Sequence, residues 1–182
     1  RTQLIQADGT QTSYGYDPLD RLVSVMQNDR HAQPDSNDTN VQTRYGYDAR
    51  GLLKSVINAN NAETLRTYTE VGLLETETDP LKRVWQYTYN GVGKRMSRLD
   101  PLGHTTTYAY FPDYQRQQIA YADGSTVDYT YDANNNRLSM QDSAGTTIWT
   151  YDALNRAVAQ NDGFDRVLQF AYDAMDNRTQ LT

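Results

Sequence analysis

Residues 127–140 read VDYTYDANNNRLSM, two short segments joined by a turn. In the first segment Val127, Tyr129 and Tyr131 alternate with polar residues, which is the period of a half-buried β-strand. The turn at 132–135 contains Asp and Asn, which bond their own backbone, and Asn also tolerates a positive φ. A second, mostly polar segment follows the turn. The stretch therefore predicts one β-hairpin.

The same pattern recurs through the chain with a period of 21 residues. We call the second aromatic residue of each unit the anchor tyrosine, and the residue two positions earlier, aromatic in seven of eight units, the leading aromatic residue. Successive anchors are 31, 21, 21, 21, 21, 20 and 21 residues apart. We expect both sets to be the structural anchors of a repeat array. The anchor tyrosines are Tyr16, Tyr47, Tyr68, Tyr89, Tyr110, Tyr131, Tyr151 and Tyr172, and the leading aromatic residues are Tyr14, Tyr45, Tyr87, Tyr108, Tyr129, Trp149 and Phe170.

An aspartate follows most anchors, at the first position of the turn. A carboxylate at this place accepts hydrogen bonds from nearby backbone amides and so stabilises the turn. The alternative is an acid/base pair or a set of calcium ligands, but a residue that recurs at the same place in most units suits architecture better than one active site. We therefore expect turn capping by Asp17, Asp48, Asp132, Asp152 and Asp173.

One such hairpin buries too little surface to fold alone, so its stability has to come from neighbouring hairpins. Eight hairpins give about sixteen strands, and open sheets of that size curl. We therefore expect an all-β fold of tandem antiparallel β-hairpins that form a long curved sheet strip. One face of the strip carries an aromatic core and the other face is polar. No segment sustains the 3.6-residue period of a helix.

The predicted organisation is a single array of eight repeats over residues 1–182, with an irregular polar loop inserted at 27–40. The insertion accounts for the one long anchor spacing, and its Asp, Asn, Gln and Ser residues are typical of an exposed loop. The chain begins without Met and ends shortly after a Tyr-Asp unit. We therefore expect it to be part of a longer protein.

The composition argues against several classes of partner. Lys and Arg total 17 against 23 Asp and Glu, a net charge of −6, and no basic run is present to neutralise nucleic-acid phosphates. No apolar stretch approaches the roughly 20 residues of a spanning helix, and the chain contains no targeting signal. The absence of cysteine removes disulfides, thiolate catalysis and cysteine-ligated zinc.

We predict no catalytic residue, no cofactor and no metal ligand. His31 and His104 are the only histidines and are not paired at ligand spacing. The segment 35–40 resembles a calcium loop only weakly, because the sixth position lacks Gly and the twelfth lacks Glu. Phosphate-binding loops and nucleophile elbows are absent. A glycosidase that uses paired aspartates is therefore disfavoured.

The units at 14–22, 129–138 and 151–156 closely resemble the tyrosine-aspartate (YD) repeats of bacterial RHS proteins, and the likeness covers essentially the whole chain. In that family the repeats wind as a β-sheet spiral into a hollow shell, with related shells in Tc toxin complexes and teneurins. The resemblance implies a non-enzymatic shell segment that encloses and shields a toxin or other cargo polypeptide for delivery. The implied partners are the rest of the parent chain and the cargo, and the implied location is outside the cell or at its surface.

Three units depart from the family pattern. The third has Arg66 in place of the leading aromatic residue and Thr69 in place of the turn aspartate, while Asn90 and Phe111 replace the aspartate in the next two. We expect weaker turns at these places. The family segment that closes the shell and cleaves itself is not seen, so neither toxin nor cleavage chemistry is implied for this chain.

A different class of function is an adhesion or carbohydrate-binding module, because rows of tyrosine can stack on sugar rings. The candidates for such contacts are the aromatic residues that are neither anchor tyrosines nor leading aromatic residues: Phe111, Tyr114, Tyr121 and Phe164. Unpaired strand edges are templates for pairing, so edge-to-edge self-association of the chain is a further expectation.

Overall fold

The computed structural model describes residues 3–7, 10–29, 40–164 and 166–182. In these residues seventeen strands and no helix occur, which confirms the all-β prediction. The chain divides into two compact units, residues 1–87 and 88–182. Most of the predicted loop insertion, residues 30–39, lies outside the described residues.

The first unit is an antiparallel meander in which each strand pairs with the next one along the chain, from β1 to β8. The last of its strands, β8, continues two residues into the second unit. The strands are β1 (Gln3–Ile5), β2 (Gln11–Tyr16), β3 (Leu22–Gln27), β4 (Val41–Tyr47), β5 (Leu53–Ile57), β6 (Glu63–Tyr68), β7 (Leu74–Thr78) and β8 (Val84–Tyr89).

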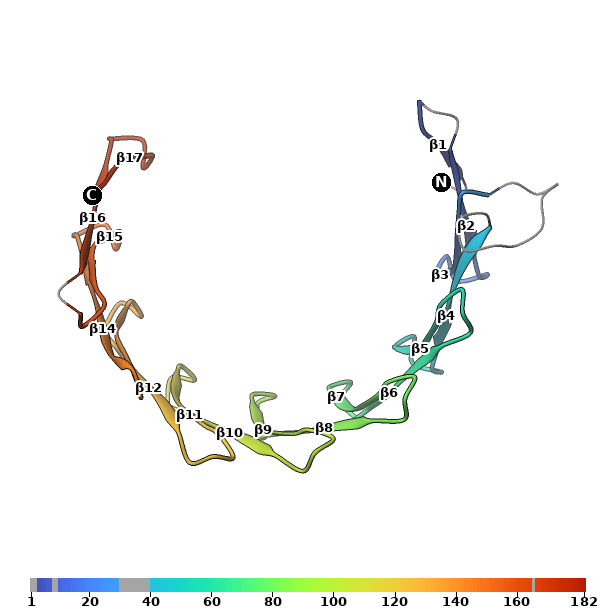
Figure 1. Cartoon of the computed structure of the whole chain (residues 1–182), viewed down its shortest axis with the longest axis horizontal. Coiled ribbons are helices and arrows are strands. Elements are labelled where there is room, and N and C mark those ends of the chain that lie inside the picture. Colours follow the sequence, from blue (N-terminus) through green and yellow to red (C-terminus); the bar gives the residue numbers. More distant parts are fainter. Residues whose placement is uncertain (1–2, 8–9, 30–39, 165) are drawn as a thin grey trace. The chain divides into compact units, whose positions relative to one another are not determined.

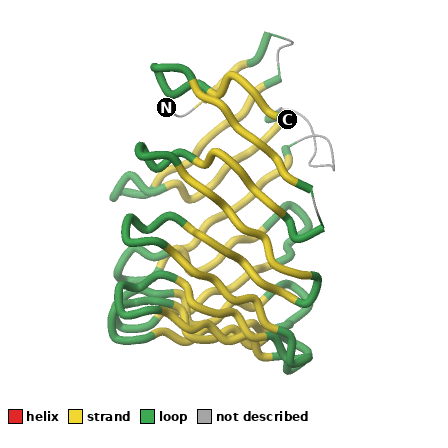
Figure 2. The backbone as a smooth tube through the Cα atoms, turned by 90° about the vertical axis from the view of Figure 1, so that its left-hand side faces the viewer, coloured by secondary structure: helices red, strands yellow, loops and turns green. Residues whose placement is uncertain are grey.

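The second unit repeats this meander from β9 to β17. Its sheet bends gradually from β10 to β16 (Figure 1), and the turns gather along the two edges where the strands end (Figure 2). The strands are β9 (Arg95–Leu99), β10 (Thr105–Tyr110), β11 (Arg116–Ala120), β12 (Thr126–Tyr131), β13 (Arg137–Asp142), β14 (Gly145–Tyr151), β15 (Ala157–Asn161), β16 (Val167–Tyr172) and β17 (Arg178–Leu181).

Seven of the eight anchor tyrosines lie at a register shift before the turn. In the hairpin of β12 and β13, Thr130 pairs with Ser139 but Tyr131 pairs with Arg137, so one residue of β13 is bulged. The turn closes through the Asp132 amide, which donates to the Asn136 carbonyl at 2.9 Å, and its last residue, Asn135, has φ 69°. This is a three-residue loop with a left-handed final residue. The sequence patterns Asp-Pro-Leu-Asp and Asp-Ala-Leu-Asn supply that residue.

The three departing turns keep the same backbone bonds. The amides of Thr69, Asn90 and Phe111 donate to carbonyls four residues later at 2.8, 2.9 and 2.9 Å. At Asn90 the side-chain oxygen also accepts from two turn amides, as an aspartate would, so the expected weakening is absent there. Thr69 keeps one such bond, and Phe111 has no side-chain oxygen to make any.

The expected aromatic core is wrong in its degree of burial. Among the described residues Ile119 is the one buried hydrophobic side chain, no large side chain is fully buried, and Tyr16 is 43% exposed. The other anchors are half-buried. The reason is that each ring is covered by its lateral neighbours in the sheet and not by a second layer. Contacts between neighbouring strands therefore have to supply the stability of this fold.

Candidate functional site

Five anchor tyrosines join their repeat to the one before it through a hydrogen bond of the hydroxyl group, and Tyr131 makes no such bond within the described residues. The hydroxyl of Tyr172 donates to the Ala157 carbonyl at 2.9 Å, and that of Tyr151 donates to the Arg137 carbonyl at 2.9 Å. In both cases the acceptor is the first residue of the second strand of the preceding hairpin. The same bond is made at 2.7–2.8 Å by Tyr47 to Leu22, Tyr68 to Leu53 and Tyr110 to Arg95.

The sequence indicates this hydrogen bond through the identity of the anchor residue, which the number of aromatic residues does not reveal. All eight anchors are tyrosine, whereas the leading position also accepts Trp and Phe. If the anchor position needed only a half-buried ring, phenylalanine would also occur there. The invariance within this chain therefore points to a role for the hydroxyl group, although the acceptor can be found only once the register is known.

The leading aromatic residues each face a side chain on the next strand. Tyr129 pairs with Met140, and Trp149 pairs with Gln160, whose side-chain oxygen accepts from the indole nitrogen at 3.2 Å. In the third unit Arg66 takes the aromatic position and its cross-strand partner is Glu77, with Nε and Oε2 2.7 Å apart. The lost ring is thus replaced by an ion pair at the same pair of positions.

This exchange predicts a measurable coupling. Arg66→Tyr alone leaves Glu77 without its cation, and Glu77→Val alone does the same to Arg66, so each single change is expected to destabilise the chain. The double variant restores the pattern of the other repeats. In a urea double-mutant cycle we expect a coupling of about 1 kcal/mol, since both side chains are partly exposed. Additive effects of the two changes would contradict the pairing.

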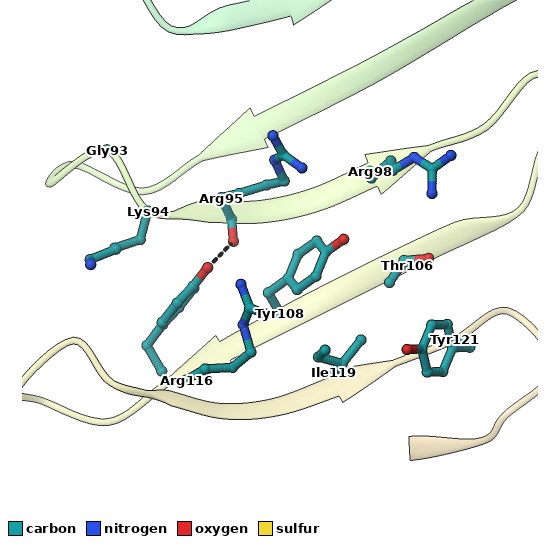
Figure 3. Close-up of a pocket in the computed structure, with 10 residues that line it drawn as sticks. Gly93, Lys94, Arg95, Arg98, Thr106, Tyr108, Arg116, Ile119 and Tyr121 are labelled. Atoms are coloured by element: carbon teal, nitrogen blue, oxygen red, sulfur yellow. Dashed lines mark hydrogen bonds between the residues drawn. The ribbon is translucent and has the colours of Figure 1, made fainter. Parts of the chain in front are cut away.

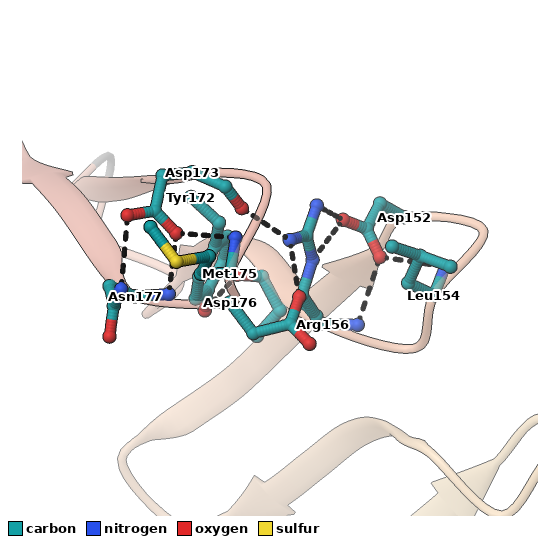
Figure 4. Close-up of polar contacts among 9 residues, drawn as sticks. Asp152, Leu154, Arg156, Tyr172, Asp173, Met175, Asp176 and Asn177 are labelled. Atoms are coloured by element: carbon teal, nitrogen blue, oxygen red, sulfur yellow. Dashed lines mark hydrogen bonds and ion pairs between the residues drawn. The ribbon is translucent and has the colours of Figure 1, made fainter.

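The turn aspartates bind backbone amides in a constant geometry. Oδ1 of Asp152 accepts from the amides of Leu154 and Arg156 at 2.9 and 3.0 Å, while Oδ2 lies 2.7 Å from Nη2 of Arg156 (Figure 4). The same two amide bonds, two and four residues ahead, are made by Asp17, Asp48, Asp132 and Asp173. Asp79 and Asp100 make them in the turns that close the units.

Two of the arginines beside these aspartates reach across to the next repeat. Nη1 of Arg156 lies 2.8 Å from Oδ1 of Asp176 and 3.3 Å from the Asp173 carbonyl (Figure 4). Arg50 makes the equivalent link to the carbonyls of Thr69 and Glu70 at 2.7 and 2.9 Å. These links along the turn edge add to those made by the anchor hydroxyls, and no pattern in the sequence predicts them.

Hydrogen bonding lowers the pKa of the turn carboxyls. For Asp17 the largest cause is the side-chain bond from Arg21, and for Asp152 it is the backbone amide of Arg156. For Asp132 it is the side chain of Asn136. The pKa is lowered likewise at Asp48, Asp79, Asp100, Asp123, Asp162 and Asp173.

A lowered pKa in the folded state makes stability depend on acid pH. The carboxyls lose their contribution when they are protonated, which happens below the ordinary aspartate value of about 3.9. We therefore expect the melting temperature to be unchanged between pH 7 and 5 and to fall steeply below about pH 4. Circular dichroism melts across this range test the prediction. A constant melting temperature down to pH 2.5, or a fall already between pH 7 and 5, would contradict it.

The remaining sequence candidates do not form one site. Phe111 lies edge-on to Tyr131 with ring centroids 6.3 Å apart, and Phe164 lies beneath Arg166. Tyr114 ends the turn after β10, with φ 68° and half of its surface exposed. Tyr121 lines a hollow described below. A sugar-binding role for these residues stays a prediction.

No metal site or membrane-crossing helix is found in the part of the chain that the structure describes. That part holds no cluster of three metal-binding side chains, and none of its elements is a helix of the length and apolarity that crossing a membrane requires. His104 lies beside Asp100 with Nδ1 and Oδ2 3.2 Å apart, and His31 lies outside the described residues.

A hollow opens on the aromatic face between β9 and β11 (Figure 3). The leading residue Tyr108 and the side chains of Arg95, Arg98 and Arg116 line it. A second hollow lies over β12 to β14 and shares Arg116 with the first. It is also lined by Arg137 and by the anchors of two repeats.

The RHS-repeat family model matches residues 115–147 and 151–182. These two segments carry RHS repeats. The matched residues hold the repeats anchored at Tyr131, Tyr151 and Tyr172, which supports the resemblance drawn from the same pattern in the other units. No curated protein matches the chain.

Solved structures contain a sheet with a similar fold. A crystal structure of TcdB2-TccC3-Cdc42 matches at 16% identity with a TM-score of 0.75, and one of TcdB2-TccC3 at 17% and 0.74. The Photorhabdus luminescens Tc holotoxin pore with TccC3-D651A matches at 16% and 0.72. Each match covers 94% of this chain and 11% of the other. The chain therefore spans about a ninth of the length of these neighbours.

Proposed function

We propose that this RHS-repeat chain is a non-enzymatic segment of a β-shell that encloses and shields a toxin or other cargo polypeptide for delivery. The observation that carries the proposal is the one-layer sheet built from hairpins that bond mainly to their neighbours. Such a sheet grows by one hairpin per repeat and forms a wall without needing a closed core. The fold shared with parts of TcdB2-TccC3 supports it.

Exposed apolar side chains at the turn tips support the proposal that further polypeptide covers this segment. Most first turns of the repeats place an apolar residue at the tip, and these side chains are strongly exposed. Leu19 is 72% exposed, Val71 82% and Met175 81%. Rows of exposed apolar side chains are typical of surfaces that are covered by a partner. In this proposal the partner is the rest of the parent chain.

Three further statements belong to the same proposal. The eight repeats form one array over residues 1–182, the anchors and turn aspartates serve as its structural residues, and the parent protein acts outside the producing cell or at its surface. The exposed edge strands β1 and β17 continue into neighbouring repeats of the parent chain, and they pair with other copies when those repeats are missing.

Limited proteolysis of the parent protein tests the proposal. A shell predicts that a segment of the chain, or a bound cargo, resists protease until the sheet is loosened. The variant Tyr151→Ala should make that segment cleavable at lower urea concentrations, while Thr150→Ala on the opposite face should not. Equal cleavage of every segment in the unmodified protein would overturn the shell function.

A further inference from the structure

The two hollows of the aromatic face form one strip of positive charge. Lys94, Arg95, Arg98 and Arg116 line the first hollow, and Arg116 and Arg137 line the second. No aspartate or glutamate lines either of them. The chain as a whole carries a net charge of −6, so this strip is opposite in sign to the rest of the molecule.

The arginines of the strip differ from those of the turns. Near the turns and in the third repeat, six arginines form ion pairs with carboxylates: Arg21, Arg50, Arg66, Arg83, Arg156 and Arg166. Within the described ranges, no carboxylate forms an ion pair with Arg98, Arg116 or Arg137. Three guanidinium groups on one face are therefore available to a partner.

Aromatic rings hold two of these guanidinium groups in place. The guanidinium carbon of Arg116 lies 5.3 Å from the ring centre of Tyr108. That of Arg137 lies 4.9 Å from the Trp149 ring and 5.8 Å from the Tyr129 ring. Stacking on a ring leaves the N–H groups at the edge of the guanidinium free to donate. The side chains are thus ordered in advance, which lowers the entropic cost of binding.

The charge is confined to the second unit. The residue six positions after the anchor is Leu22, Leu53 and Leu74 in the first three repeats, and it is Arg95, Arg116 and Arg137 in the next three. The backbone role is the same at Leu22 and Leu53 as at Arg95 and Arg137, because each of these carbonyls accepts the hydroxyl of the following anchor. The change from leucine to arginine is therefore not required by the fold.

We propose that this strip, Arg95, Arg98, Arg116 and Arg137 with the tyrosines between them, binds an acidic polypeptide segment laid across the strands. Equivalent positions in successive repeats are two strands apart, or about 9.6 Å. A peptide in the polyproline II conformation advances about 9.3 Å in three residues and brings every third side chain back to the same side. Carboxylates at every third residue would therefore meet successive arginines, and the residues between them would lie against the tyrosine rings.

The observations favour a polypeptide over a nucleic acid. The strip holds few cations, and a long polyanion would also meet the negative charge of the remaining surface. A peptide with two or three carboxylates needs only the strip. This inference rests on the proposed shell function, which it deepens by assigning an acidic, extended segment to the enclosed polypeptide.

Peptide binding to the complete 182-residue chain tests the proposal. The probe is a fluorescein-labelled peptide with the sequence Glu-Ala-Tyr repeated four times, and its control has Gln in place of every Glu. We expect the acidic peptide to bind at least about tenfold more tightly in 50 mM salt, and this preference to shrink in 500 mM salt. Equal binding of the two peptides would overturn the proposal.

Matched variants locate the contact. The double variant Arg116→Gln with Arg137→Gln should weaken binding about tenfold or more, and the corresponding double Lys variant should retain part of it. Arg166→Gln, which changes an arginine at an edge turn, should leave binding unchanged. Far-ultraviolet circular dichroism verifies that the variants are folded. Unchanged binding by the double Gln variant, or tighter binding of a poly(U) oligonucleotide to the same residues, would overturn the proposal.

The shell function and this inference can fail separately. Protease protection in the parent protein tests the shell and does not depend on the peptide probe. Protection without peptide preference would reject the acidic partner alone. Peptide preference without protection would reject the shell, and the strip would then be a surface for an external acidic partner.

Discussion

Tyr151→Ala is expected to lower the free energy of unfolding by about 2–4 kcal/mol. Truncation of a fully buried aromatic side chain costs about 3–5 kcal/mol, and this ring is half-buried. The change also removes the hydroxyl that donates to the Arg137 carbonyl and links two repeats. Urea unfolding followed by tryptophan fluorescence measures the effect, because Trp149 lies two residues away in the same strand.

Two conservative variants separate the ring from the hydroxyl. Tyr151→Phe keeps the ring and should cost about 1 kcal/mol, the net value of one hydrogen bond. Tyr131→Phe should cost close to nothing, because in the described residues the Tyr131 hydroxyl has no hydrogen-bond partner. Thr150→Ala on the polar face should cost well under about 1 kcal/mol. Equal effects at Thr150 and Tyr151 would show that the two faces are wrongly assigned.

Asp152→Ala is expected to produce the second large loss of stability. The carboxylate holds two turn amides and the guanidinium of Arg156, and that guanidinium also binds the turn of the next repeat. Removing one side chain therefore loosens two turns. We expect the melting temperature to fall by about 3–6 °C, as for the loss of a capping side chain in a domain of this size.

The control for this prediction is Asp152→Asn. An asparagine oxygen caps two turn amides at Asn58 and Asn90 in this same chain, so the amide bonds should survive and only the ion pair should weaken. The melting temperature should therefore fall much less than in Asp152→Ala. A fall of the same size in both variants would show that the charge, and not the cap, stabilises the turn.

The strand pattern could be predicted from sequence because its causes are local. Alternation around Tyr129 and Tyr131 and the turn residues after them fix a hairpin within 14 residues, and repetition fixes the rest. The left-handed residue at the turn end follows from residue type at Asp20, Gly51 and Asn155, whereas Tyr114 takes that conformation without such a signal. These features require no knowledge of distant contacts.

The links between repeats could not be predicted in this way because they depend on register. Arg66 and Glu77 are eleven residues apart, and their pairing becomes visible only when β6 and β7 are aligned. The acceptor of the Tyr68 hydroxyl is fifteen residues away in the preceding hairpin. The predicted burial of the aromatic rings is too high for a related reason. The prediction of an aromatic core assumes a second layer over the rings, and the described sheet has none.

The dependence of each hairpin on its neighbours is tested most directly by unfolding fragments of increasing length. Urea titrations of residues 145–161, 124–182 and 88–182 compare one hairpin with progressively longer parts of the second unit. The account predicts no cooperative transition for 145–161 and a midpoint that rises with the number of repeats. A cooperative transition for the single hairpin in plain buffer, or a midpoint independent of length, would contradict it.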